Sequence, residues 1–181
     1  MTCRARRIEG ALRDRVVRLR PRRATGEPPA LRLRRAVPAD AEAVRALTRA
    51  AYAKWCAVIG REPLPMGADQ ERAIREHRVD LAFLGEALAG LVETVARRHD
   101  LLIESLAVDP AWQGRGLGER LLRHAEAVAG ELGLGVVRLY TNALFASNLA
   151  FYRARGYSVE REEPFRGGTI VHLMRRLNQP G

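Results

Sequence analysis

Residues 113–118 read QGRGLG and separate an apolar run, LLIESLAV (101–108), from a helical pattern that follows them. The first backbone amides of a helix have no partner within the helix, and they lie at the positive end of its dipole. Glycines let a ligand approach that backbone closely, and Arg115 adds a positive charge beside it. The segment therefore predicts a loop that binds phosphate or pyrophosphate.

The spacing of the glycines excludes two familiar phosphate loops. A dinucleotide fold requires GxGxxG in an early strand-helix-strand unit, whereas Gly114, Gly116 and Gly118 give GxGxG late in the chain. The phosphate loop of many nucleotide hydrolases requires a Gly-Lys pair, and the sequence has none. Taken by itself, the loop is equally consistent with a structural turn.

Glu104 interrupts the apolar run at a position where the strand should be buried. An unpaired carboxylate costs several kcal/mol there, so it needs a partner, a water-filled cleft or a raised pKa. Two interpretations stay open, a structural pair with one of the many arginines and a general base. Glu93, on the neighbouring expected strand, is a second choice for the base.

Two motifs together are more specific than the loop alone. QGRGLG (113–118) resembles the Q/R-x-x-G-x-G/A acetyl-CoA loop of the GNAT superfamily of N-acetyltransferases, and SLAVDPAWQ before it resembles that family's central strand. NLAFY (148–152), followed by GY (156–157), is similar to the family's downstream N-x-x-x-Y…GY segment. The resemblance covers roughly residues 31 to 177.

The resemblance implies a binding site for acetyl-CoA, the acyl donor. The backbone of Leu106, Ala107 and Val108 would pair with the pantetheine arm, because the central strand splays from its neighbour there. The amides of the loop would hold the pyrophosphate, and Asn148 would contact the arm. Asn148 could also be a helix N-cap. The implied loop residues are Gln113, Gly114, Arg115, Gly116, Leu117 and Gly118.

Tyr152 is the implied catalytic acid. Attack of an amine on a thioester expels a thiolate, and a phenol near the sulfur protonates it. The amine arrives as ammonium and must first lose a proton, for which Glu104 is the expected base. The N–H of Val108 would polarise the carbonyl and stabilise the oxyanion. Cys56 is not expected near the acyl group, so the transfer should be direct, within a ternary complex.

The acceptor pocket is expected between the first two helices and the strands that follow them. Tyr52, Trp55 and Met66, together with the stiff EPLP stretch (62–65), are the expected walls. Each of these side chains could equally be ordinary packing. The sequence does not identify the acceptor beyond an amine of a small molecule or a peptide.

The elements that must position these residues follow from hydrophobic periodicity. The predicted order is β-α-α-β-β-β-α-β-α-β-β, a mixed α/β (α+β) domain with a central mixed sheet of about seven strands and about four helices. The unbroken apolar run predicts a strand at the centre of the sheet, buried on both faces. The expected strands are 31–37, 81–84, 87–95, 101–108, 136–141 and two more after residue 156, with a helix over 147–156.

The charge divides the chain into two parts. Residues 1–29 hold nine arginines against three acidic residues, which accounts for +6 of the net charge of +10. They are expected to form a basic, flexible extension, and residues 30–181 to form the acetyltransferase domain. The extension could bind nucleic acid. We consider that interpretation less favoured, and a non-catalytic domain that binds or senses acyl-CoA is the other alternative.

Composition narrows the class of protein further. The sequence contains only two cysteines and no CxxC or Cys-His cluster, so neither a disulfide framework nor a structural metal is expected. No apolar stretch approaches the length of a membrane span. We therefore expect a cytoplasmic acetyl-CoA-dependent N-acetyltransferase without a metal. Dimers are common in this family, but the sequence does not fix the oligomeric state.

Overall fold

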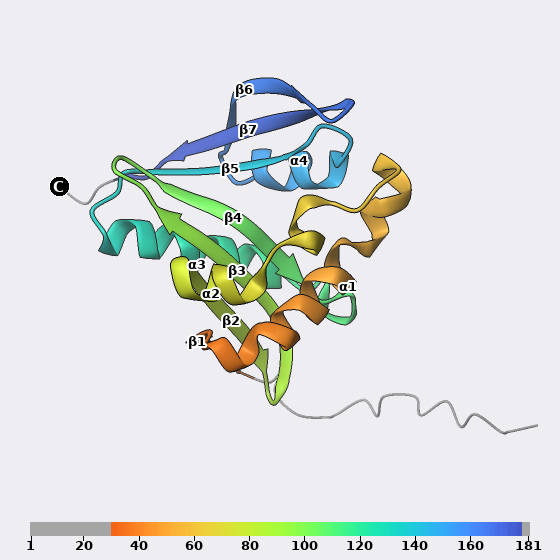
Figure 1. Cartoon of the computed structure of the whole chain (residues 1–181). Helices are drawn as coiled ribbons and strands as arrows, with labels where there is room; N and C mark the ends of the chain where they lie inside the picture. The colour runs from red at the N-terminus through yellow and green to blue at the C-terminus, as the bar shows by residue number, and fades with distance from the viewer. Residues whose placement is uncertain (1–29, 179–181) are drawn as a thin grey trace, which may run out of the picture.

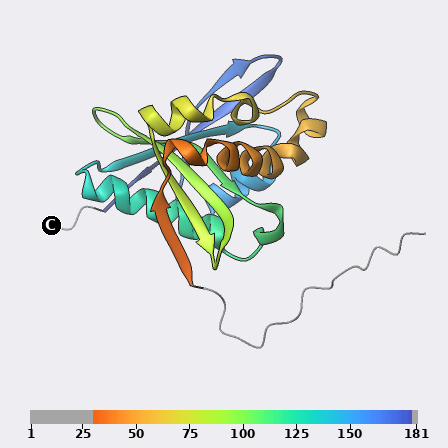
Figure 2. The ribbon, with the colours of Figure 1, turned by 60° about the horizontal axis from the view of Figure 1, so that its bottom comes forward.

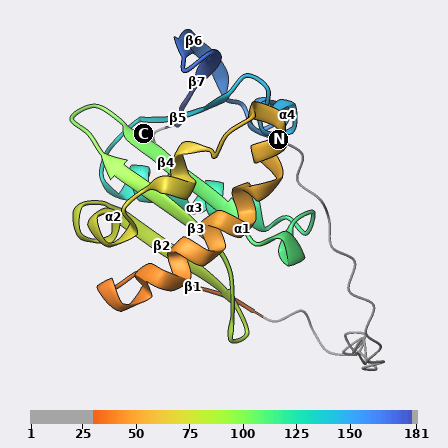
Figure 3. The same ribbon diagram turned by 45° about the vertical axis from the view of Figure 1, so that its right-hand side comes forward.

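The computed structural model describes residues 30–178, and in this range a seven-stranded sheet lies between two pairs of helices (Figure 1). Helices α1 and α2 cover one face of the sheet, and α3 and α4 cover the other (Figure 3). In chain order the elements are β1 (Leu31–Arg35), η1 (Pro38–Asp40), α1 (Ala41–Ile59), η2 (Leu64–Gly67), α2 (Gln70–Glu76), β2 (Arg78–Leu84), β3 (Ala87–Ala96), β4 (Leu101–Val108), η3 (Pro110–Trp112), α3 (Leu117–Glu131), β5 (Val136–Asn142), α4 (Ala146–Arg153), β6 (Ser158–Phe165) and β7 (Gly168–Arg176).

The strand order in the sheet is β1-β2-β3-β4-β5-β7-β6. All neighbours are antiparallel except β4 and β5, which are parallel because α3 connects them as a crossover. The order of helices and strands confirms the prediction, and the apolar run forms the central strand β4. Strand β1 lies at one edge of the sheet and the β6–β7 hairpin at the other (Figure 2).

Several predicted boundaries differ from those in the structure. Strand β2 begins at Arg78 rather than Leu81, and β1 ends at Arg35. Asp40 is the N-cap residue of α1, but its carboxylate makes no capping hydrogen bond to that helix. The carboxylate instead accepts hydrogen bonds from the Val37 N–H at 2.8 Å and from the Arg34 guanidinium at 2.7 Å. The predicted N-terminal extension, residues 1–29, lies outside the described residues.

Two apolar cores hold the layers together. One core lies between the sheet and the helices α3 and α4, and the apolar stripe of α3 faces it, as the helical spacing in the sequence predicts. The other lies between the sheet and α1, whose buried residues Val44, Leu47 and Ala51 recur at helical spacing. The two cores fix the helices on opposite faces of β4.

The parallel pairing of β4 with β5 is short. It joins only residues 101–103 of β4 to residues 137–139 of β5, although β4 continues to Val108. Beyond Ile103 the two strands diverge, which is visible in Figure 1 and Figure 3. We call this divergence the fork. It opens a space between two central strands of the sheet.

A β-bulge in β4 coincides with the start of the fork. Glu93 on β3 pairs with Ser105, whereas the next residue, Thr94, pairs with Ile103, so Glu104 is the extra residue. Because of the bulge, Ile103 and Ala107 lie on opposite faces of the sheet, although a regular strand would place them on the same face. Ile103 packs in the core beside α3, whereas Ala107 packs in the core beside α1.

The close approach of β3, β4 and α3 leads to a stability prediction at Gly90. A Cβ built at this position would lie 2.9 Å from the Ala107 carbonyl oxygen and 3.0 Å from the Leu121 side chain. We expect Gly90→Ala to lower the free energy of unfolding by about 1–3 kcal/mol because the core is overpacked. Urea unfolding followed by circular dichroism measures this change.

Gly130 is the matched control for that substitution. It lies in α3, and a Cβ added there would meet nothing within 4 Å, so Gly130→Ala should raise the stability by up to about 1 kcal/mol through helix propensity. Equal effects of the two substitutions would contradict the packing that we describe around Gly90.

Candidate active site

The edge of β4 that faces the fork carries free backbone groups. Asp109 N donates to Ala89 O at 2.9 Å, and opposed residues in an antiparallel pair alternate between bonded and non-bonded. The backbone of Ala107 therefore bonds to β3, whereas the N–H groups of Leu106 and Val108 point into the fork. On this side β4 has no neighbouring strand, so an extended ligand can hydrogen-bond to its backbone as an added strand.

The glycine loop ends at the N-terminus of α3. Gly114 and Gly116 have positive φ angles of 74° and 80°, which explains why these positions are glycine. A Cβ at Gly118 would lie 3.6 Å from the Phe151 ring and 3.8 Å from the Val108 side chain. These are ordinary contact distances, so the feature of this end of α3 that suits an anion is its first-turn amides.

The loop and the free edge of β4 border one groove of about 1150 Å³, which we call the loop groove. Its walls come from α1, β4, the loop, the start of α3 and α4. The residues that line it are Ala51, Tyr52, Lys54, Trp55, Leu106, Ala107, Val108, Trp112, Gln113, Gly114, Gly116, Leu117, Gly118, Glu119, Ser147, Asn148, Phe151, Tyr152 and Arg155.

The loop residues predicted from the sequence lie in this groove with one exception. The Gln113 side chain donates to the Val108 carbonyl at 2.9 Å and accepts from the Lys54 ammonium at 3.1 Å, so it joins the loop to β4 and α1. Arg115 does not line the groove. Its guanidinium lies over the Trp112 ring, 5.0 Å from the ring centroid.

Asn148 and Tyr152 lie one turn apart on α4, at the point where the fork is open. The cap of α4 is Phe145, so the interpretation of Asn148 as an N-cap is wrong. Tyr152 is only 8% exposed, and burial raises the pKa of its phenol. The phenol therefore remains protonated at neutral pH and is available as a donor.

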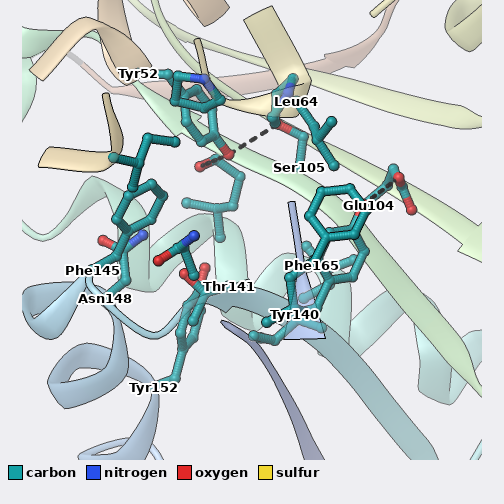
Figure 4. A pocket seen from close by; sticks show the side chains of 18 of the residues that line it. Tyr52, Leu64, Glu104, Ser105, Tyr140, Thr141, Phe145, Asn148, Tyr152 and Phe165 are labelled. Atoms are coloured by element: carbon teal, nitrogen blue, oxygen red, sulfur yellow. Dashed lines mark hydrogen bonds between the residues drawn. The ribbon is translucent and has the colours of Figure 1, made fainter. Parts of the chain in front are cut away.

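A second cavity, of about 670 Å³, adjoins the loop groove at the fork, and we call it the fork pocket (Figure 4). It shares Tyr52, Leu106, Asn148 and Tyr152 with the loop groove, so the two spaces meet at these four side chains. Its other lining residues are Ile59, Arg61, Pro63, Leu64, Pro65, Ile103, Glu104, Ser105, Leu139, Tyr140, Thr141, Asn142, Phe145, Phe165 and Ile170.

Glu104 lines the fork pocket. Its carboxylate accepts a hydrogen bond of 2.5 Å from the Tyr140 hydroxyl on β5, as Figure 4 shows. No ion pair joins Glu104 to an arginine within residues 30–178, so the structural pair that the sequence left open is not found. Burial and the adjacent carboxylate raise the pKa of Tyr140. Among the described residues, a phenol rather than a guanidinium is therefore the partner of this carboxylate.

The three expected acceptor walls lie in different places. Tyr52 lines both cavities, and its hydroxyl lies 3.3 Å from Ser105 Oγ and 3.4 Å from the Leu106 carbonyl oxygen. Trp55 lines the loop groove, where its ring stacks on Phe145 at a centroid distance of 4.1 Å. Met66 is buried against Cys56, with 3.7 Å between the sulfur atoms, and lines neither cavity.

A third cavity, the α2 pocket, adjoins the fork pocket and has a volume of about 840 Å³. Glu93 lies in it, 7% exposed, and its carboxylate contacts His77 Nδ1 at 2.6 Å. Burial raises the pKa of Glu93. The residues that line the α2 pocket are Thr48, Leu64, Pro65, Ala68, Asp69, Gln70, Arg72, Ala73, Glu76, His77, Glu93, Glu104, Ser105 and Tyr140.

Two residues in these cavities were not anticipated. Tyr140 follows the last paired residue of β5, and the register that joins Leu101 to Val137 would place it opposite Glu104. The register of the parallel strands was therefore the signal that could have identified it. Arg155 bridges Phe151 O and Glu119 at 2.9 Å each, which fixes the end of α4 against α3.

Two general searches of residues 30–178 gave negative results. No helix in this range is long and apolar enough to cross a membrane. Within the same range, no three histidine, cysteine, aspartate or glutamate side chains are grouped closely enough to hold a metal ion.

Comparison with known proteins gives a consistent result. The family model described as Acetyltransferase (GNAT) family matches residues 43–157. No curated protein matches the sequence. The fold is similar to that of the PaiA N-acetyltransferase from Thermoplasma acidophilum in complex with coenzyme A, with 19% identity over 79% of this chain and 98% of that chain and a TM-score of 0.68.

Two further solved structures show the same fold. An acetyltransferase from Thermus thermophilus is 25% identical over 81% of this chain and 97% of that chain, with a TM-score of 0.63. YncA from Salmonella typhimurium, determined with its cofactor acetyl-CoA, is 18% identical over 84% of this chain and 96% of that chain, with a TM-score of 0.64.

Proposed function

The chain belongs to the GNAT family of acetyltransferases, and from this membership we propose that it transfers the acetyl group of acetyl-CoA to an amine by direct attack in a ternary complex. The observation that carries the proposal is the fork. Two cavities meet there at Tyr52, Leu106, Asn148 and Tyr152. A donor in one cavity and an acceptor in the other would bring their reacting atoms together.

The loop groove fits acetyl-CoA. The first-turn amides of α3, exposed by Gly114, Gly116 and Gly118, would bind the pyrophosphate. The free edge of β4 at Leu106 and Val108 would bond to the amides of the pantetheine arm, and Asn148 would contact the arm from the other side. The carboxamide of Gln113 already occupies the Val108 carbonyl, so it would fix the loop rather than bind the donor directly.

The acetyl group would then lie at the fork. The N–H of Val108 would donate to the thioester carbonyl and stabilise the oxyanion that forms on attack. Glu104, directly or through water, would take a proton from the incoming ammonium. As the new C–N bond forms and the C–S bond breaks, the buried phenol of Tyr152 would protonate the departing thiolate. The phenol would regain a proton, through water, from the proton that the attacking nitrogen loses as it becomes an amide.

The amine itself would enter from the fork pocket, as part of a small molecule or of a peptide. We place the enzyme in the cytoplasm, where acetyl-CoA is available. The family resemblance also leaves a homodimer open.

The first test of this proposal is a calorimetric titration with acetyl-CoA, CoA and NAD. We expect micromolar binding of acetyl-CoA and CoA and no binding of NAD. Gly116→Ala should raise the Kd for acetyl-CoA about tenfold or more, because the change alters the amides that face the pyrophosphate.

Gly133→Ala is the matched control. Gly133 also has a positive φ, 69°, and open space around it, but it lies outside the loop groove. Both substitutions should cost about 1–2 kcal/mol of stability through backbone strain. Equal effects on acetyl-CoA binding, or no binding by the folded wild-type protein, would overturn the proposed donor site.

A second prediction concerns Tyr152. Tyr152→Phe should lower kcat for acetyl transfer by about 10²–10⁴-fold and leave the Kd for acetyl-CoA unchanged, because the hydroxyl would act on the leaving group alone. Tyr157→Phe is the control, since Tyr157 is equally buried but its hydroxyl bonds to Glu126 and it lines neither cavity. An unchanged kcat in Tyr152→Phe would favour a domain that binds acyl-CoA without this catalytic acid.

A third prediction concerns Glu104. Glu104→Gln should lower kcat/KM by about 10²–10⁴-fold at pH 7, and the loss should shrink as the pH approaches the amine pKa of about 10, where the acceptor is already neutral. Tyr140→Phe removes only the hydrogen bond to this carboxylate and should retain most of the activity. A deficit in Glu104→Gln that does not change with pH would argue for a structural role.

A further inference from the structure

The α2 pocket has no role in the transfer described so far, yet it continues the fork pocket. The two cavities share Leu64, Pro65, Glu104, Ser105 and Tyr140. A molecule with its amine at the fork therefore has a second compartment next to it, on the far side of Glu104. The chemistry of that compartment should reflect the rest of the acceptor.

The α2 pocket is acidic, although the chain as a whole carries a net charge of +10. Four carboxylates line it, those of Asp69, Glu76, Glu93 and Glu104, against the single guanidinium of Arg72, which gives a formal charge of −3 with His77 neutral. Arg72 is bonded to Glu76 at 2.8 Å. The carboxylates of Glu93, which is buried, and of Glu104, which is half-buried, have no arginine or lysine partner among the described residues.

The inner wall of the α2 pocket carries carboxylate oxygens that are free to accept further hydrogen bonds. Glu93 and Glu104 each use one carboxylate oxygen, for His77 and Tyr140 respectively. The second oxygen of each makes no hydrogen bond with another side chain in the described range. Burial raises the pKa of Glu93; the hydrogen bond and charge of His77 oppose this shift, and the negative charge of Glu104 adds to it.

Gln70 provides an independent observation. Its side chain lines the α2 pocket and is only 4% exposed. Its Nε2 donates to the Pro65 carbonyl at 3.3 Å, which leaves Oε1 without a donor among residues 30–178. An amide oxygen can only accept hydrogen bonds, so this atom is free to accept one from a ligand in the pocket. Its most suitable partner is a ligand that brings N–H groups.

A metal ion is a poor match for these groups. No cluster of three metal-binding side chains occurs in the part of the chain that the structure describes, and His77 is already engaged by Glu93. The acceptors come from three elements, α2, β3 and β4. An organic cation with several N–H donors fits this arrangement better.

We propose that the α2 pocket binds a second positive charge of the acceptor, so that the substrates are elongated diamines or polyamines whose distal ammonium contacts Glu93 and the Oε1 of Gln70. The reacting amine then lies at the fork, beside Glu104, and an aliphatic linker joins the two ends past Leu64 and Pro65. This inference rests on the proposed function, because it takes the fork pocket as the acceptor site.

Three ligands that differ only at the distal end test the proposal. The protein, saturated with CoA, is titrated by calorimetry with hexane-1,6-diamine, hexylamine and 6-aminohexanoate. The diamine should bind about tenfold or more tightly than hexylamine, the value expected for a charge-assisted hydrogen bond, and 6-aminohexanoate should bind most weakly. Equal affinities for the diamine and hexylamine would overturn the inference. So would tightest binding of 6-aminohexanoate, which would indicate Arg61 of the fork pocket as the distal partner.

A substitution at Glu93 tests whether the tighter binding of the diamine arises in the α2 pocket. Glu93→Gln should remove most of the advantage of the diamine and leave the affinity for hexylamine unchanged. Glu71→Gln, an exposed position on α2 outside the pocket, should keep that advantage. A full advantage of the diamine in Glu93→Gln would overturn the assignment to this pocket. If the variant does not fold, the three-ligand comparison on the wild-type protein still decides.

Ligand affinity and acetyl transfer, measured separately, distinguish this inference from the proposed function. Diamine selectivity without acetyl transfer would uphold the cation site and overturn the enzymatic proposal. Acetyl transfer with equal kcat/KM for the diamine and hexylamine would uphold the enzyme and overturn the cation site.

Discussion

The separation of β4 from β5 after Ile103 is the constraint on which the rest of the structure depends. A continuous parallel pair would use the inner backbone groups of Leu106 and Val108 within the sheet and would fill the space beside them. Ending the pair leaves these groups without partners in the backbone of the sheet. Side chains satisfy the two carbonyl groups. Gln113 donates a hydrogen bond to the Val108 carbonyl, and the Tyr52 hydroxyl lies near the Leu106 carbonyl oxygen. The unpaired N–H groups remain for a ligand.

The two sides of the fork differ in chemistry. The loop groove presents glycine amides, the N-terminus of α3 and the side chains of Lys54 and Arg155, which suit a phosphorylated ligand. The fork pocket and the α2 pocket present phenols and carboxylates, which suit a cation. The bulge at Glu104 produces part of this difference, because it directs Glu104 and Ser105 to the same side of the strand. A regular strand would direct these two side chains to opposite faces.

The sequence predicted the elements well and the site only in part. Periodicity depends on local burial, so the helical stripe of α3 and the apolar run of β4 were recognisable without tertiary information. The bulge was not, because it reflects the match between β3 and β4 rather than any single residue type. The partner of Glu104 was missed for the same reason: it depends on the register of two strands that are 36 positions apart. Arg115 was expected at the phosphate loop from its neighbours in sequence, yet the Trp112 ring holds its guanidinium outside the groove.

The bond between Tyr140 and Glu104 connects the fork to the chemistry proposed for it. The two residues lie one position beyond the last backbone pair of β4 and β5. Where the strands separate, this side-chain hydrogen bond therefore joins them in place of backbone hydrogen bonds. The phenol donates a hydrogen bond to the carboxylate and, unlike a guanidinium, brings no positive charge to it. An arginine at the same position would hold the strands equally well but would remove the negative charge that an incoming ammonium requires. In the proposed mechanism, a neutral donor thus orients the carboxylate without cancelling its negative charge.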